Sequence, residues 1–179
     1  MEEVVPVKID FKKFKELFPD ESSGWEIELR VSWPDRDLSG VDMAYAFAID
    51  SMFSKLPKDI RKPLALFVSA TSVHTVQCAD FNDYEIECDY DPEEWMDAAL
   101  PKLDPRKMKR IAKALDEFRK QDYQGAIREA WKNSDVESNE GVTDRLEAAD
   151  DFIEYLEHWI AAFVEIHNDG AVLGVAISL

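Results

Sequence analysis

Apolar and polar residues alternate strictly along Trp25–Trp33. A period of two predicts a β-strand with one buried face and one face in water, and Glu26 and Glu28 fall on the face in water. A second alternation, Tyr84–Tyr90, predicts another strand. The run Leu64–Cys78 has almost no charge and many Val, Thr and Phe residues, which favours a central strand paired with Tyr84–Tyr90 in a hairpin. Glu3–Ile9 is a further short strand candidate.

Apolar residues at a spacing of three and four predict helices in most of the remaining chain. Asp, or Ser in one case, precedes each of these stretches and is the expected N-cap, and Pro or a further acid follows in several of them. The predicted N-caps are Asp10, Ser39, Asp91, Asp104, Asp122 and Asp144. Between the last two helices, Asn133–Gly141 is polar and predicts a linker.

The C-terminal end of the chain allows two interpretations. Phe163–His167, followed by Asn168, Asp169 and Gly170, favours one arm and the turn of a closing β-hairpin. The alternative is that residues 161–167 continue the preceding helix and that Gly170 caps it. With the first interpretation, residues 1–179 form a single acidic α+β domain. Its sheet is mixed or antiparallel, has about four to six strands and carries helices on one side.

Charge adds a second kind of information. The net charge is −17, from 38 Asp and Glu against 21 Lys and Arg. The stretch 80–97 has nine acids and no cation, and the stretch 135–169 has eleven acids and one Arg. Pro101–Ser134 lies between them with ten basic and five acidic residues. This balance disfavours direct binding to nucleic acid or to an anionic membrane, and favours a cationic partner.

The first candidate binding face follows from the second alternation. Its acids lie on one strand face without a cation in their own segment, which is destabilising unless a cationic ligand meets them. Trp95 adds an aromatic anchor of the kind found in binding hot spots. The predicted face comprises Glu85, Glu87, Asp89, Asp91, Glu93, Glu94 and Trp95, with Glu26 and Glu28 from the neighbouring strand. A second acidic face is predicted at Glu147, Asp150, Asp151 and Glu154.

No motif for catalysis, metal binding or cofactor binding stands out. Six glycines do not form a phosphate loop, and the three histidines have no metal-ligand spacing. No stretch reaches the about 18 apolar residues of a membrane span. The acidic start is unlike an export signal, so we expect a cytoplasmic protein with reduced cysteines. Whether Cys78 and Cys88 are near neighbours stays open.

These observations favour a non-enzymatic module, monomeric or weakly dimeric, that binds a basic protein. The leading hypothesis is a bacterial immunity or antitoxin-type inhibitor of a basic, nuclease-like toxin. A DNA mimic directed at a DNA-handling protein is an alternative, because acids at alternate strand positions lie about 6.5–7 Å apart, near the phosphate repeat. An enzyme with an unmarked carboxylate site and a housekeeping adaptor are further alternatives.

Overall fold

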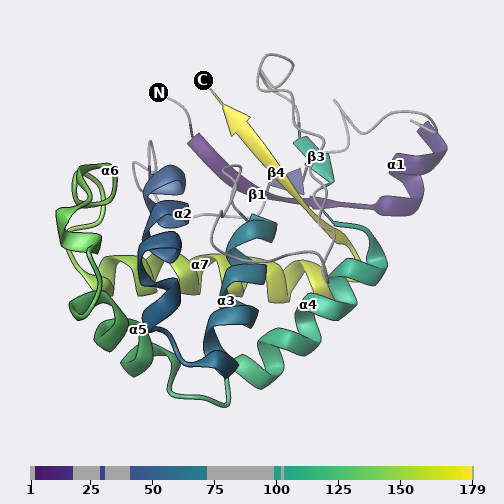
Figure 1. The fold of residues 1–179 in the computed structure, drawn as a ribbon. Helices are drawn as coiled ribbons and strands as arrows, with labels where there is room; N and C mark the ends of the chain where they lie inside the picture. Colours follow the sequence, from purple (N-terminus) through teal and green to yellow (C-terminus); the bar gives the residue numbers. More distant parts are fainter. Residues whose placement is uncertain (1–2, 18–28, 31–40, 72–98, 102, 179) are drawn as a thin grey trace.

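The computed structural model describes residues 3–17, 29–30, 41–71, 99–101 and 103–178. This part of the chain is mostly helical (Figure 1). Its seven α-helices are α1 (Phe11–Leu17), α2 (Val41–Met52), α3 (Lys58–Thr71), α4 (Pro105–Phe118), α5 (Tyr123–Lys132), α6 (Glu140–Thr143) and α7 (Ala149–Asn168). Two 3₁₀ turns, η1 (Phe53–Lys55) and η3 (Val136–Ser138), connect helices.

The sheet is built on one long pair of strands. β1 (Glu3–Ile9) and β4 (Val172–Ser178) are antiparallel and in register along their whole length. A two-residue strand, β2 (Leu29–Arg30), pairs with β1, and a three-residue strand, β3 (Ala99–Pro101), pairs with β4. The order is therefore β2-β1-β4-β3, with the two chain ends at its centre.

The predicted fold class is wrong. We expected a sheet of about four to six strands to organise the domain, whereas helices make up most of the described chain and one strand pair carries the sheet. The main error is Leu64–Cys78, predicted to be the central strand, because α3 extends through Thr71. Seven of the last eight residues of α3 are buried, so the stretch lacks the polar face that gives a helix its visible period.

The predicted closing hairpin is also wrong, and the alternative interpretation is confirmed. α7 continues to Asn168, and Gly170 follows with φ +70. Gly170 N–H donates to the carbonyl of His167 (3.0 Å), and Ala171 N–H donates to that of Ile166 (3.1 Å). This pair of bonds is a Schellman cap. β4 then pairs with β1 at the other end of the chain.

Several local predictions are confirmed. Glu3–Ile9 is a strand, and helices follow the predicted N-caps Asp10, Asp104 and Asp122. Asp104 Oδ1 accepts from the backbone N–H groups of Arg106 and Lys107, both at 2.8 Å. Of the predicted strand Trp25–Trp33, the structure describes only Leu29–Arg30, which form the strand β2. The predicted elements at Tyr84–Tyr90 and Asp91, and the two cysteines, lie outside the described residues.

The region between α5 and α7 differs from its prediction. The expected linker Asn133–Gly141 contains η3 and the beginning of α6. The expected N-cap Asp144 is the C-cap of α6, and α7 begins only at Ala149. The reason is that Val136, Val142 and Leu146 are buried, so this polar segment is held against the domain at three points.

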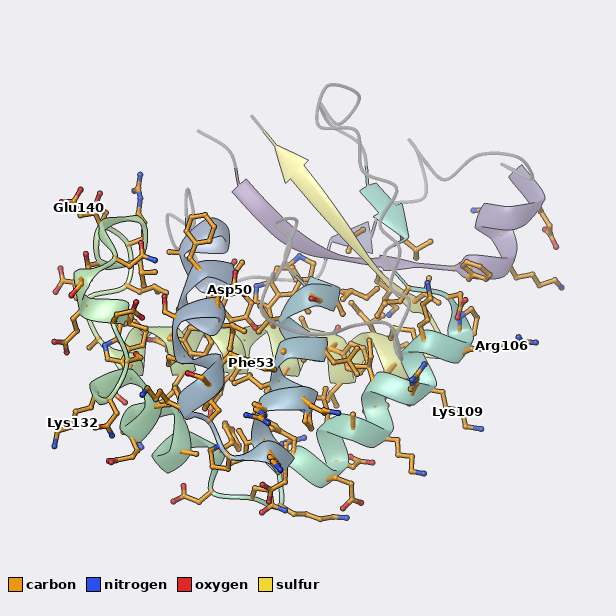
Figure 2. The ribbon with its side chains drawn as sticks, viewed as in Figure 1. Asp50, Phe53, Arg106, Lys109, Lys132 and Glu140 are labelled. Carbon is orange, nitrogen blue, oxygen red and sulfur yellow. The ribbon has the colours of Figure 1, made fainter. Side chains whose placement is uncertain are left out.

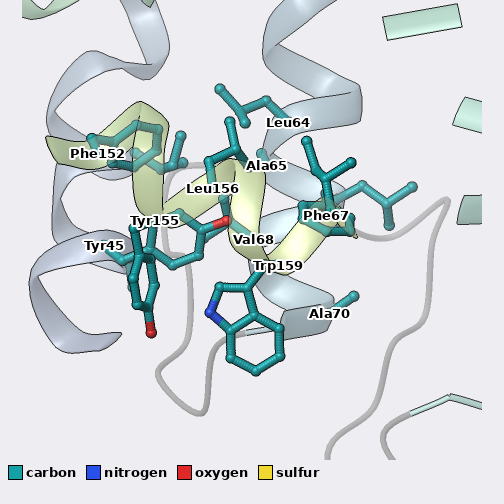
Figure 3. Packing of buried hydrophobic residues seen from close by; sticks show 14 of the residues in the cluster. Tyr45, Leu64, Ala65, Phe67, Val68, Ala70, Phe152, Tyr155, Leu156 and Trp159 are labelled. Carbon is teal, nitrogen blue, oxygen red and sulfur yellow. The ribbon is translucent and has the colours of Figure 1, made fainter. Parts of the chain in front are cut away.

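α7 is the central element of the core. It contacts β1 and β4 on one side and α4 and α5 on the other, and lies beneath the sheet in Figure 1. Its aromatic side chains meet those of α2 and α3. The ring centroid of Tyr45 lies 4.9 Å from that of Tyr155 and 5.1 Å from that of Phe152 (Figure 3). On α3, the ring centroid of Phe67 lies 5.7 Å from that of Phe163. Burial of these rings fixes the positions of the helices that carry the surface acids.

Candidate partner-binding surface

Acidic side chains gather where η3, α6 and the beginning of α7 follow one another. η3 and α6 pack together and α6 packs on α2, at the end of the molecule marked by Glu140 in Figure 2. All these acids are exposed except Asp151, which is half-buried. We call this surface the acidic wall. It comprises Asp135, Glu137, Glu140, Asp144, Glu147, Asp150, Asp151 and Glu154.

Local sequence explains how the wall is shaped. The Asn139 side chain accepts from the N–H of Gly141 at 3.1 Å and so caps α6. A Cβ at Gly141 would lie 3.3 Å from the ring of Phe47 on α2, so the absence of a side chain allows α6 to approach α2 closely. Buried valines and a buried leucine anchor the segment, and the acids between them point to solvent.

Structural partners of two acids of the wall, Asp150 and Asp151, can be named. Asp150 Oδ1 lies 2.8 Å from Nε of Arg128 on α5, in an exposed ion pair. Asp151 Oδ2 accepts from the backbone N–H groups of Glu147 (2.9 Å) and Ala148 (3.0 Å), and so caps the beginning of α7. Both acids lie in the first turn of α7, where the helix dipole favours negative charge.

Other acids of the wall have no counter-ion among the described residues. The carboxylates of Glu137, Glu140 and Asp144 make no ion pair with any of them, and the same holds for those of Asp135 and Glu147. These five side chains are exposed on η3, on α6 and in the segments beside them. Arg145 is an exposed cation in the same segment and also makes no ion pair with a described residue, so five acids against one cation leave this part of the wall net negative.

One further acid of α7, Glu157, is engaged by α5. Its carboxylate accepts from the hydroxyl of Tyr123 at 2.8 Å and from the amide of Gln124. Burial, and then this hydrogen bond to Glu157, raise the pKa of Tyr123. The phenol stacks on Phe118 with ring centroids 4.5 Å apart. Glu157 thus links α7 to α5, and we leave it out of the acidic wall.

An aromatic side chain borders the wall. Phe47 is half-buried and lies against Gly141, beneath the segment that carries Glu140. Aromatic side chains are enriched in protein–protein interfaces, so Phe47 is a candidate apolar contact beside these acids. Sequence reasoning missed Phe47, because it lies among the apolar residues of a predicted helix and nothing local in the sequence shows that its ring stays half-buried.

The structure tests the placement of only one of the two predicted faces. The second acidic face, Glu147, Asp150, Asp151 and Glu154, lies together at the beginning of α7 and belongs to the acidic wall. The acids before Glu147 were not among the predicted site residues, although the eleven acids of stretch 135–169 were a signal for them. The first predicted face lies outside the described residues and stays a prediction: Glu26, Glu28, Glu85, Glu87, Asp89, Asp91, Glu93, Glu94 and Trp95.

The described ranges contain neither a candidate membrane-spanning helix nor a candidate metal site. No described helix is long and apolar enough to cross a lipid bilayer. In the same ranges, no three His, Cys, Asp or Glu side chains are grouped so as to hold a metal ion. In comparisons with known proteins, no family model, curated protein or solved structure matches the chain.

Proposed function

We propose that the chain is a non-enzymatic, cytoplasmic protein that binds a basic protein through the acidic wall. The best setting for such a module is an immunity or antitoxin-type inhibitor of a basic, nuclease-like toxin. The observation that supports it most is the set of five exposed acids without a counter-ion among the described residues. Crowding like charges destabilises a free protein, and a cationic partner removes that cost.

The arrangement of the wall also suits rapid binding. An exposed field of one sign steers an oppositely charged protein and allows association at about 10⁸–10⁹ per molar per second at low salt. An inhibitor that must reach a toxin before it acts gains from such a rate. Phe47, at the edge of the wall, supplies an apolar contact that charge alone does not provide.

The acids of the wall are carried mainly by helices and turns. DNA mimicry was inferred from the alternate spacing of Glu85, Glu87 and Asp89, which lie outside the described residues. The described wall does not have strand spacing, so we prefer the inhibitor. An enzyme with an unmarked carboxylate site, or a housekeeping adaptor, predicts no basic partner that is released by salt.

Capture of partners from the source organism tests the proposal. The immobilised protein is expected to retain one basic protein in stoichiometric amount at about 0.05 M salt and to release it at about 0.5 M, because screening removes exposed attractions. The variant Glu137→Lys/Asp144→Lys is expected to lose that protein. The matched control Glu16→Lys/Glu165→Lys changes net charge equally through exposed acids away from the wall and is expected to retain it.

Two results would argue against the proposal. If no basic protein is retained at low salt, the binding function itself is refuted. If one is retained equally by the wall variant, the acidic wall is not the contact. The first predicted face is then tested in the same way with Glu85→Lys/Glu87→Lys/Asp89→Lys.

A further inference from the structure

A surface of the opposite sign lies on α3 and α4. These helices pack against each other, and each carries exposed cations. None of these cations lies within ion-pair distance of a described acid, although Lys113 attracts Glu117 one turn further along α4. We call this the cationic surface; it comprises Lys58, Lys62, Arg106, Lys109 and Lys113.

The cations of α4 are placed at a cost to the helix. Between Pro105 and Leu115 there are five cations and no acid. Arg106 and Lys107 lie in the first turn, at the positive end of the helix dipole, where cations are unfavourable. Lys109 and Lys113 are four residues apart, so two like charges are neighbours on one face. Asp104 offsets part of this cost as the N-cap.

The α4 cations of the cationic surface and the acidic wall lie at opposite ends of the molecule. Figure 2 shows Arg106 and Lys109 on α4 at one end and Glu140 on α6 at the other. One surface therefore cannot neutralise the other within the same copy. A chain of net charge −17 thus keeps two complementary surfaces, and on each of them several charges make no ion pair among the described residues: Asp135, Glu137, Glu140, Asp144 and Glu147 on the wall, and the five cations of the cationic surface.

We propose that the cationic surface of one copy docks on the acidic wall of a second copy. A second copy is the occupant we choose because its complementary surface is present in the described structure. A head-to-tail contact uses different patches on the two copies, so it does not close as a two-fold dimer. It produces open chains or rings whose size increases with protein concentration.

Two electrostatic effects set the conditions for this association. The net charge makes two copies repel each other at long range, and that repulsion extends furthest at very low salt. The docking contacts act at short range and are screened only when salt is high. Self-association is therefore expected to be strongest near about 0.1 M salt and to disappear near about 0.5 M.

The contact shares the acidic wall with the proposed function, but it needs no foreign partner. Self-association covers the wall. The wall becomes exposed again when the copies dissociate, either on dilution or when a stronger cationic ligand competes for it. If the wall variant loses a foreign partner while the wild type never self-associates, the proposed function stands and the present inference fails. If instead the wild type self-associates through the wall but captures no foreign basic protein, the present inference stands and the proposed function fails.

Sedimentation velocity of the full chain tests the contact. The wild type is expected to exceed the monomer mass of 20.6 kDa at high protein concentration near about 0.1 M salt, and to return to it near about 0.5 M. Lys109→Glu/Lys113→Glu and Glu137→Lys/Asp144→Lys are each expected to weaken association about tenfold or more. Circular dichroism checks that each variant is folded.

Controls separate the contact from net charge. Lys12→Glu/Lys13→Glu on α1 shifts the net charge as much as the α4 variant does, from −17 to −21, and is expected to associate like the wild type. The wall variant lowers the net negative charge, so its loss of association cannot come from general repulsion. Mixing the α4 variant with the wall variant is expected to restore association, because each retains the surface that the other lacks. A wild type that stays monomeric at both salts, or a mixture that does not associate, would overturn the inference.

Discussion

Gly170 adopts a backbone conformation that side chains rarely allow. Its φ of +70 reverses the chain between α7 and β4. A Cβ at this position would meet no atom within 4 Å, so a substitution changes backbone energy and nothing else nearby. The Schellman bonds depend on this conformation, because they aim two N–H groups back at the last turn of α7.

Gly170→Ala is therefore expected to lower the free energy of unfolding by about 1 kcal/mol. Gly170→Asn is the matched control and is expected to cost less, because Asn tolerates the left-handed region better than Ala does. Urea denaturation of the three proteins measures the difference. Equal stability of the Ala variant and the wild type would mean that the turn relaxes to a negative φ.

Tyr123 provides a prediction about pH. Burial, and then the hydrogen bond to Glu157, raise its pKa, so the folded state favours the neutral phenol. Its contribution to stability is fully present below the unfolded pKa of about 10, and is lost as the pH rises through the folded pKa. NMR titration of the ring, assigned with Tyr123→Phe, is expected to show this raised value. Glu157→Gln should lower it only in part, since burial remains, and an unchanged pKa would exclude the carboxylate as a cause.

At the scale of elements, the local sequence predicted where helices begin better than it predicted whether a segment is a helix or a strand. Asp104 and Asp122 each cap a helix with their own side chains, and this signal lies within four residues of sequence. Leu64–Cys78 carried no such signal. Its described part, residues 64–71, is buried almost throughout, and a buried segment shows neither helical nor strand periodicity. This part is a helix that packs against α2 and α4 and contacts α7 through Phe67.

The acidic wall could likewise be predicted only in part. The run of acids from Asp135 onward is visible in sequence, but the matching of individual acids is not. Asp150 meets Arg128, which is 22 residues away, and Asp151 turns back to its own backbone. Asp144 carried the expected N-cap signal, yet Leu146 is buried after it and the helix begins later. The burial of Leu146, and not the local capping signal at Asp144, therefore determines where α7 begins.

The capping role of Asp151 gives a prediction at this scale. Asp151→Ala removes two hydrogen bonds at the beginning of α7 and is expected to lower the free energy of unfolding by about 1 kcal/mol. Glu147→Ala is the matched control from the same wall. Its carboxylate makes no hydrogen bond or ion pair with a described residue, so a change within about 0.5 kcal/mol is expected. Thermal or chemical denaturation of both variants compares them. Similar losses would contradict the cap.

At the scale of the whole molecule, charge is unevenly distributed. The acidic wall and the α4 cations lie at opposite ends, although Arg128 and Arg145 lie at the acidic end, and the central helix α7 connects the two regions. Mixing the same residues evenly would allow more ion pairs and less repulsion, although each exposed pair contributes only about 0–1 kcal/mol. The arrangement therefore lowers stability slightly and produces two strong local electrostatic fields.

Repulsion among the acids of the wall has a measurable effect on the stability of the free protein. Glu137→Lys/Asp144→Lys is expected to raise the free energy of unfolding by up to about 1 kcal/mol at low salt, because it relieves repulsion among neighbouring acids. The gain should shrink between about 0.05 and 0.5 M salt as screening weakens that repulsion. The same variant is expected to lose partner binding, so stability and function should move in opposite directions. A loss of stability at low salt would show that these acids hold the fold together, and the physical reason for a binding wall would disappear.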